Sequence, residues 1–136
     1  PDALNIARQN AEQLGIKNIS FHESNWLSAL GDHVLDIIVA NPPYVRENDP
    51  YLDQGDLRFE PATALTCGPT GLEAINTIAS EARQHLKDGG WLLFEHGYDQ
   101  AKETTALLKQ HQFHNVECKK DIAGHNRISL GQYNSE

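Results

Sequence analysis

The chain has 136 residues, enough for one domain, and 39% of them are apolar, which is sufficient for a globular core. Its formal net charge is −8 and its densest basic spot is only Lys119-Lys120, which argues against a nucleic-acid-binding surface. No apolar run is long enough to span a membrane, and the first residues lack a secretory signal pattern.

The first residue and the cysteines add two expectations. The chain begins with Pro1 and contains no Met, so we expect it to be a piece of a longer protein. Cys67 and Cys118 lie far apart without metal-ligand spacing, which indicates reduced thiols. We therefore expect a cytoplasmic protein.

The first third of the chain predicts one helix and two strands. Apolar residues at helical spacing predict a helix over residues 2–14, which Gly15 ends. The alternation of Ile19-Ser20-Phe21 predicts a short strand. Residues 35–40, Leu-Asp-Ile-Ile-Val-Ala, form a nearly continuous apolar run that is typical of a strand buried on both faces of a parallel sheet.

The middle of the chain predicts a long loop and a second helix. Residues 41–69 show no clean periodicity, and a loop of that length is usually functional. Apolar spacing over residues 71–87 predicts a helix, which Asp88-Gly89-Gly90 would end.

The last third completes an alternating pattern. We expect a buried strand over residues 91–95, a helix over 99–111, and two final strands over 116–119 and 127–133. The final strands are close in sequence and so should be antiparallel to each other. The alternation of helices and strands predicts an α/β fold with a largely parallel sheet.

The strongest chemical signal is the Asn-Pro-Pro-Tyr segment of residues 41–44, called the acceptor segment below. It directly follows a buried strand, at the edge where open α/β sheets bind ligands. Pro42 and Pro43 fix two φ angles and remove two donors, and Asn41 is restricted because it precedes a proline. The Asn41 side-chain oxygen and the Pro42 carbonyl could then accept both hydrogens of one NH2 group, with Tyr44 packed on a flat group.

Such a site suits methyl transfer to a planar nitrogen. The lone pair of an amide or an aromatic amine is delocalised, and two acceptors on its hydrogens raise electron density and aim the nitrogen. The transfer then depends mainly on positioning. Asn-Pro also opens ordinary turns, so a rigid turn is the structural alternative. The strand directly before the segment favours the functional interpretation.

On these residues the chain resembles the release-factor glutamine methyltransferases, the PrmC/HemK family, over essentially its whole length. The matching stretches include "LDIIVANPPYV", "GDLRFEPATAL", "GGWLLFEHGYDQ" and "DIAGHNRISLGQY". The resemblance implies a Rossmann-like fold. It also implies methyl transfer from S-adenosylmethionine to the glutamine amide of the Gly-Gly-Gln motif in peptide chain release factors, which would be the protein partners.

The resemblance also implies residue roles. Asn41 and Pro42 would bind the glutamine amide and act as the catalytic residues, while Pro43 and Tyr44 would shape the substrate pocket. Asn41 would also lie beside the cofactor. Trp26 would lie at the adenine end of the cofactor, together with Asn25, which stands where the family usually has Asp.

Some family features are missing from residues 1–136. The glycine-rich cofactor loop and the acidic residue that holds the ribose have no counterpart. We therefore expect the C-terminal part of a catalytic domain, without its first two strands and without the N-terminal helical domain. Such a piece should be inactive alone, and its unpaired strand edges should make it unstable or prone to association.

Three alternatives stay open. One is methylation of the exocyclic amine of adenine in nucleic acid, which the acidic charge opposes. Another is methylation of a glutamine in a ribosomal protein. The third is an inactive remnant.

Several other residues have weaker functional readings. Glu60 and Pro61 belong to a loop that could close over the substrate. Glu95 could orient the acceptor segment or serve as a structural carboxylate. Asp121 and Arg127 are expected to form a structural ion pair. Two further predictions are that Trp91 and Phe94 are core residues and that the scattered histidines bind no metal.

Overall fold

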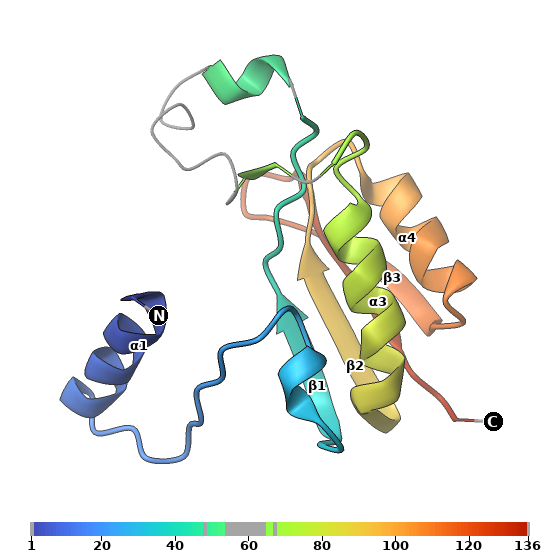
Figure 1. Cartoon of the computed structure of the whole chain (residues 1–136). Helices are drawn as coiled ribbons and strands as arrows, with labels where there is room; N and C mark the ends of the chain where they lie inside the picture. The colour runs from blue at the N-terminus through green and yellow to red at the C-terminus, as the bar shows by residue number, and fades with distance from the viewer. Residues whose placement is uncertain (1, 48, 54–64, 67, 136) are drawn as a thin grey trace. The chain divides into compact units, whose positions relative to one another are not determined.

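The computed structural model describes residues 2–47, 49–53, 65–66 and 68–135, and these form two compact units (Figure 1). The first unit is Pro1–Gly31 and the second is Asp32–Glu136. Across the described ranges, no helix is long and apolar enough to cross a membrane.

The first unit contains the helix α1 (Asp2–Gln13) and the short 3-10 helix η1 (Ser28–Leu30). Gly15 ends α1 as predicted: its φ is 67°, and the amides of Gly15 and Ile16 donate to the carbonyls of Glu12 and Ala11 at 3.0 and 2.9 Å. The predicted strand at residues 19–21 is wrong, because this stretch has no strand conformation. A strand needs a neighbouring backbone to hold its hydrogen bonds, and none of the described strands pairs with it.

The second unit is a four-stranded sheet with two helices, in the order β1-β2-β4-β3. Its elements are β1 (Leu35–Ala40), η2 (Pro50–Asp53), α3 (Glu73–His85), β2 (Leu86–Glu95), α4 (Ala101–Gln110), β3 (His114–Lys120) and β4 (Asn126–Gln132).

The strand directions agree with the predicted α/β class, and the sheet is mixed. β1 and β2 are parallel and are joined by α3, while β4 is antiparallel to both β2 and β3. The antiparallel pair at the end of the chain is confirmed. The parallel part is smaller than predicted, because β4 inserts between β2 and β3 and turns two of the three pairings antiparallel.

Both helices pack on one face of this sheet, where the core lies (Figure 1). On α3, Ile75, Ile78 and Ala79 are buried, and on β2 Leu92 and Phe94 are buried beneath the helices. Each buried Ile or Phe contributes about 1.5–3 kcal/mol of apolar transfer free energy. This packing holds the carboxyl ends of β1 and β2 in place.

The opposite face of β1 is open. Ile37 and Val39 are 57% and 76% exposed, whereas Ile38 between them is buried. The prediction that this strand is buried on both faces is therefore wrong, since α3 and α4 cover the same side of the sheet. Phe94 is a core residue as predicted, but Trp91 is only half-buried.

The junction between α3 and β2 also differs from the prediction. The helix ends at His85 and the strand begins at once with Leu86, so Asp88-Gly89-Gly90 lies inside the strand. The register to β1 shifts over this stretch, and Gly89 has a φ of 80°. The Gly89 amide donates to the Tyr133 carbonyl at 2.7 Å, so the glycines form a bulge that stays paired to the chain after β4.

Candidate functional site

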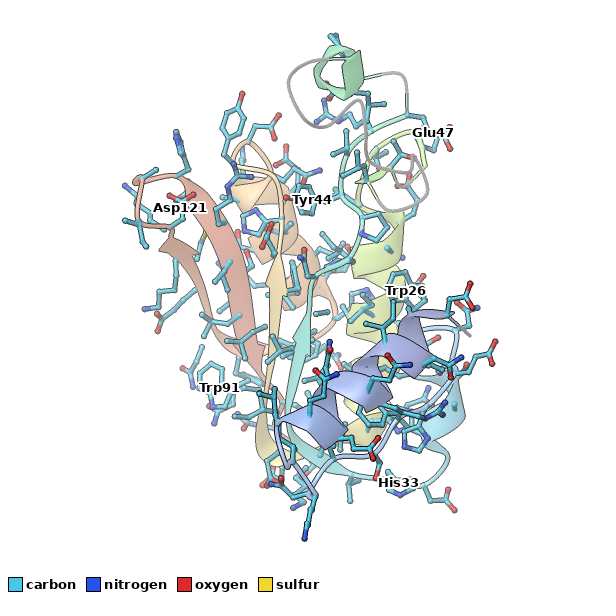
Figure 2. All side chains as sticks on the ribbon, turned by 90° about the vertical axis from the view of Figure 1, so that its left-hand side faces the viewer. Trp26, His33, Tyr44, Glu47, Trp91 and Asp121 are labelled. Carbon is cyan, nitrogen blue, oxygen red and sulfur yellow. The ribbon has the colours of Figure 1, made fainter. Side chains whose placement is uncertain are left out.

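The sheet topology gathers the site at one edge. β1 and β2 are parallel neighbours, so their carboxyl ends, Ala40 and Glu95, meet at the same edge. β4 runs the other way and begins there, with the His96 amide donating to the Arg127 carbonyl at 2.8 Å. In Figure 2, Tyr44 and Asp121 lie toward this end of the sheet and Trp91 toward the other.

A cavity of about 490 Å³ opens at this edge. One part of its lining is the acceptor segment, continued by Val45 and Arg46, and another is Glu95, residues 97–100 and Arg127. The volume is in the usual range for small-ligand sites. Residues 41–44 therefore line a cavity at the carboxyl edge of the sheet, and their role in binding a substrate stays a prediction.

Tyr44 is held at both of its ends. Its hydroxyl donates a hydrogen bond to Oε1 of Glu95 at 2.8 Å. Its carbonyl accepts one from Nε2 of Gln100 at 2.9 Å. The next amide, Val45, donates to the Leu65 carbonyl at 2.9 Å. These contacts fix the position of the tyrosine at the end of the acceptor segment.

A glycine allows the close approach behind Tyr44. Gly71 has a φ of 78°, and a Cβ at this position would clash with the Tyr44 carbonyl oxygen. No other residue fits both the left-handed backbone and the contact. The turn before α3 therefore helps to set where Tyr44 sits.

Asn41 contrasts with Tyr44. It is exposed, it lines the cavity, and its side chain has no hydrogen-bond partner among the described residues. Pro42 is buried beneath it. The Asn41 amide is thus available to a ligand.

The surroundings of Tyr44 keep it protonated. Burial raises its pKa to about 12, and the hydrogen bond and negative charge of Glu95 act in the same direction. Tyr44 is therefore a donor to Glu95 and not a base.

Charged groups line the rest of the cavity. Asp49, Glu95 and Asp99 contribute three carboxylates. Both guanidinium groups of the lining contact other protein groups. Arg46 donates to the Thr70 carbonyl at 3.2 Å, and Arg127 lies 3.4 Å from Asp121 and 5.9 Å from the Tyr98 ring centroid. The predicted Asp121–Arg127 ion pair is confirmed, and it holds an arginine at the cavity wall.

A buried polar network lies behind the site. His96 is fully buried, with Nδ1 2.8 Å from the Gly97 carbonyl and Nε2 2.9 Å from the Ser129 hydroxyl. The Ser129 hydroxyl is in turn 2.8 Å from that of Thr104 on α4. Because a carbonyl only accepts, Nδ1 carries the proton and Nε2 accepts from Ser129. Burial lowers the pKa of His96 below its usual 6.5, so the ring is neutral.

The other predicted site residues belong to the first unit or lie outside the described residues. Asn25 and Trp26 belong to the first unit, in the turn before η1, and their cofactor role stays a prediction. Glu60 and Pro61 lie outside the described residues, as does Cys67. Over the described ranges, no group of three His, Cys, Asp or Glu side chains is arranged to hold a metal ion.

Sequence reasoning missed the place of Gln100 in the cavity wall, and it predicted Arg127 only as one half of an ion pair. Gln100 follows β2 in the turn before α4, and Arg127 is the second residue of β4. The usable signal for Gln100 was its place just beyond a buried strand, next to the acceptor segment in a parallel sheet. The place of Arg127 in the wall depends on the insertion of β4, which the local sequence pattern does not show.

The second unit thus combines an α/β sheet with a cavity at the carboxyl ends of its parallel strands, bordered by Asn-Pro-Pro-Tyr. A family model described as a methyltransferase domain matches residues 1–131, and the chain belongs to this family. A ribosomal protein L11 methylase from Lactobacillus delbrueckii subsp. bulgaricus shares the fold. Its TM-score is 0.66 at 17% identity, over 98% of this chain and 54% of that one.

Curated relatives named release factor glutamine methyltransferase confirm the predicted resemblance. The relative from Vibrio cholerae serotype O1 is 47% identical over 137 residues, and the one from Escherichia coli K12 is 43% identical over 133 residues. These alignments cover 100% and 98% of this chain but 48% of each relative. The chain thus spans about half the length of the curated relatives that it matches.

Proposed function

We propose that this chain supplies the amide-binding half of an enzyme that methylates the side-chain nitrogen of a glutamine in a peptide chain release factor. The supporting observation is the acceptor segment itself. At the cavity, its Asn41 amide is unpaired among the described residues, while Tyr44 is fixed by two hydrogen bonds. A site with a free acceptor on a rigid support suits recognition of an NH2 group.

One residue of the second unit, Asn41, fits S-adenosylmethionine as the methyl donor. Asn41 follows β1 directly and is exposed to the cavity, so its amide can serve a ligand beside the substrate nitrogen. Asn41 would contact the cofactor from the second unit, and Asn25 and Trp26 are proposed as cofactor residues from the family resemblance alone. When bound, the cofactor supplies an electrophilic methyl group on a sulfonium.

The protein's own contribution is positioning. The Asn41 Oδ1 and the Pro42 carbonyl accept the two hydrogens of the glutamine NH2, which turns the nitrogen lone pair toward the methyl donor. The Tyr44 ring packs on the flat amide. Accurate placement of this kind is worth several orders of magnitude in rate without an acid or a base before the transfer.

The charge of the cavity favours a protein over a nucleic acid as the substrate. Three carboxylates and two arginines line it, so its formal charge is negative, as is that of the whole chain. A phosphate backbone would meet repulsion there. Release factors act in translation, so this substrate also implies the cytoplasmic location.

The test is transfer of a labelled methyl group from S-adenosylmethionine to a purified release factor. We would compare this chain with a hybrid in which it replaces the matching 137 residues of the Vibrio cholerae relative. A release factor with Asn in place of the Gly-Gly-Gln glutamine is the matched substrate control. We expect the hybrid to label only the glutamine form. Labelling of adenine in nucleic acid instead, or of neither substrate by the hybrid, would overturn the proposal.

A further inference from the structure

We propose that Gln100 is a positioning residue, which aims the acceptor segment by holding the Tyr44 carbonyl. The inference rests on the proposed function of the cavity, and it assigns a role to a side chain outside the Asn-Pro-Pro-Tyr motif. It is carried by the hydrogen bonds on either side of Gln100 and by the chemistry of the segment that it holds.

The acceptor segment has few means of holding itself in place. Pro42 and Pro43 have no N–H, so neither can donate a backbone hydrogen bond to a neighbouring strand. β1 stops pairing with β2 at Ala40, opposite Phe94. Beyond that point the two fixed proline φ angles limit how far the chain can turn between Asn41 and Tyr44. The orientation of the free end therefore depends on how firmly Tyr44 is held.

Gln100 is well suited to hold it. The residue is only 4% exposed, and both ends of its side-chain amide are used. Its Oε1 accepts from the Gly97 amide at 2.8 Å, and its Nε2 donates to the Tyr44 carbonyl at 2.9 Å. The first bond fixes which way the amide faces, so that the NH2 end points at Tyr44.

The position of Gln100 on α4 separates this role from helix capping. Gln100 is the N-cap residue of α4, yet its side chain makes no capping hydrogen bond to the helix. An N-cap side chain normally accepts from the second or third helical amide. Here the side chain turns away from the helix and joins two loops of the site, so its loss should disturb the cavity more than the helix.

Gly71 lies beside the same hydrogen bond. A Cβ at Gly71 would clash with the Tyr44 carbonyl oxygen and come within 3.0 Å of Gln100 Nε2. The glycine therefore leaves room for the Gln100 side chain to reach this carbonyl.

Gln100→Glu tests the role with the least change in shape. The variant keeps an oxygen that accepts from Gly97, but its carboxylate faces the Tyr44 carbonyl with a second acceptor. In the hybrid enzyme near neutral pH we expect kcat to fall about 10- to 100-fold, the cost of misplacing a reacting group by roughly an ångström. The KM for the release factor should change little, because most of that protein is bound elsewhere.

The pH profile separates aiming from general stability. A protonated carboxyl can donate to Tyr44 as the amide does, and burial raises the pKa of a carboxyl. The kcat of the variant relative to wild type should therefore recover as the pH falls. The matched control is Gln110→Glu, which adds the same charge at an exposed position of the same helix and should leave both kcat and its pH profile unchanged.

Two results would overturn the inference: a wild-type kcat in Gln100→Glu, or a loss that does not vary with pH and follows the melting temperature. If the wild-type hybrid itself transfers no methyl group, the proposed function fails and the positioning is tested separately. NMR measurement of the Tyr44 carbonyl chemical shift and the Val45 amide shift would then test whether Gln100 binds the Tyr44 carbonyl. A shift that changes in Gln100→Glu and returns on acidification supports the contact, and an unchanged shift refutes it.

Discussion

The two ends of the acceptor segment are built in opposite ways. Asn41 is exposed and its side chain is unpaired among the described residues, whereas Tyr44, three residues on, is bonded at its hydroxyl and at its carbonyl. The prolines between them connect a free end to a fixed end. The contrast indicates that Asn41 is free to bind a ligand while Tyr44 holds the segment in place. Variants at the two ends should therefore change the rate and the stability to different extents.

The largest effect should come from the free end. Asn41→Ala removes one preorganised hydrogen-bonding group, and we expect methyl transfer by the hybrid to fall about 100- to 1,000-fold. The melting temperature should not change, because Asn41 is exposed. Rate measurement and thermal melting check both parts, with Asn10→Ala on α1 as the exposed control. A rate within a few-fold of wild type would contradict the role of the free end.

The next effect should come from the support beneath Tyr44. Gly71→Ala adds a Cβ against the Tyr44 carbonyl in a left-handed backbone, so we expect losses of both rate and stability. Gly124→Ala is the matched control, since Gly124 has a φ of 85° but open space around its Cβ. The control should lose about 1–2 kcal/mol of folding stability, because alanine is unfavourable in a left-handed backbone, and it should keep the wild-type rate of methyl transfer. Equal free energies of unfolding for the two variants would show that the contact with Tyr44 is unimportant.

A smaller effect is expected from the hydroxyl of the fixed end. Tyr44→Phe keeps the ring but removes the bond to Glu95, worth about 1 kcal/mol. The pKa of Tyr44 is raised to about 12 from its usual 10.0, so its contribution to stability is full below pH 10.0 and is lost as the pH rises through about 12. Difference titration of tyrosinate absorbance between wild type and Tyr44→Phe measures this. A titration midpoint near 10 would contradict the buried hydrogen bond.

The smallest expected effect is on the pH dependence of stability, through the buried hydrogen bonds of His96. The pKa of His96 lies below its usual 6.5, so the stability it contributes is present above pH 6.5 and is lost as the pH falls through its lowered value. Denaturant unfolding at a series of acidic pH values should show this decline in wild type. His96→Gln, which cannot titrate, should show a flatter dependence in the same window. If the free energy of unfolding falls equally with pH in the two proteins, protonation of His96 does not contribute to the acid destabilisation.

The sequence predicted those parts of the fold that depend on local pattern. Gly15 ends α1, the apolar face of α3 is buried, and residues 41–44 directly follow a strand at the edge of the sheet. Each follows from spacing or from backbone chemistry within a few residues. The acceptor segment was recognisable because proline and asparagine restrict their own conformations.

The remainder depends on distant partners. Residues 19–21 alternate like a strand but pair with none of the described strands, and Ile37 and Val39 are apolar but uncovered by α3 or α4. The bulge of Asp88-Gly89-Gly90 is set by its hydrogen bonds with Tyr133, which lies far along the chain. Gln100 was missed for the same reason, because its role exists only where β1 and β2 lie side by side.

The position of β4 has a consequence for how the chain matures. Among the described strands this one comes last in sequence, yet it lies inside the sheet, between β2 and β3. While the ribosome is still adding residues, one edge of β2 stays without this partner until residues 126–132 have emerged. The cavity wall at Arg127 can form only then. The nascent chain therefore completes this wall only after the residues of β1, β2 and β3 have been synthesised.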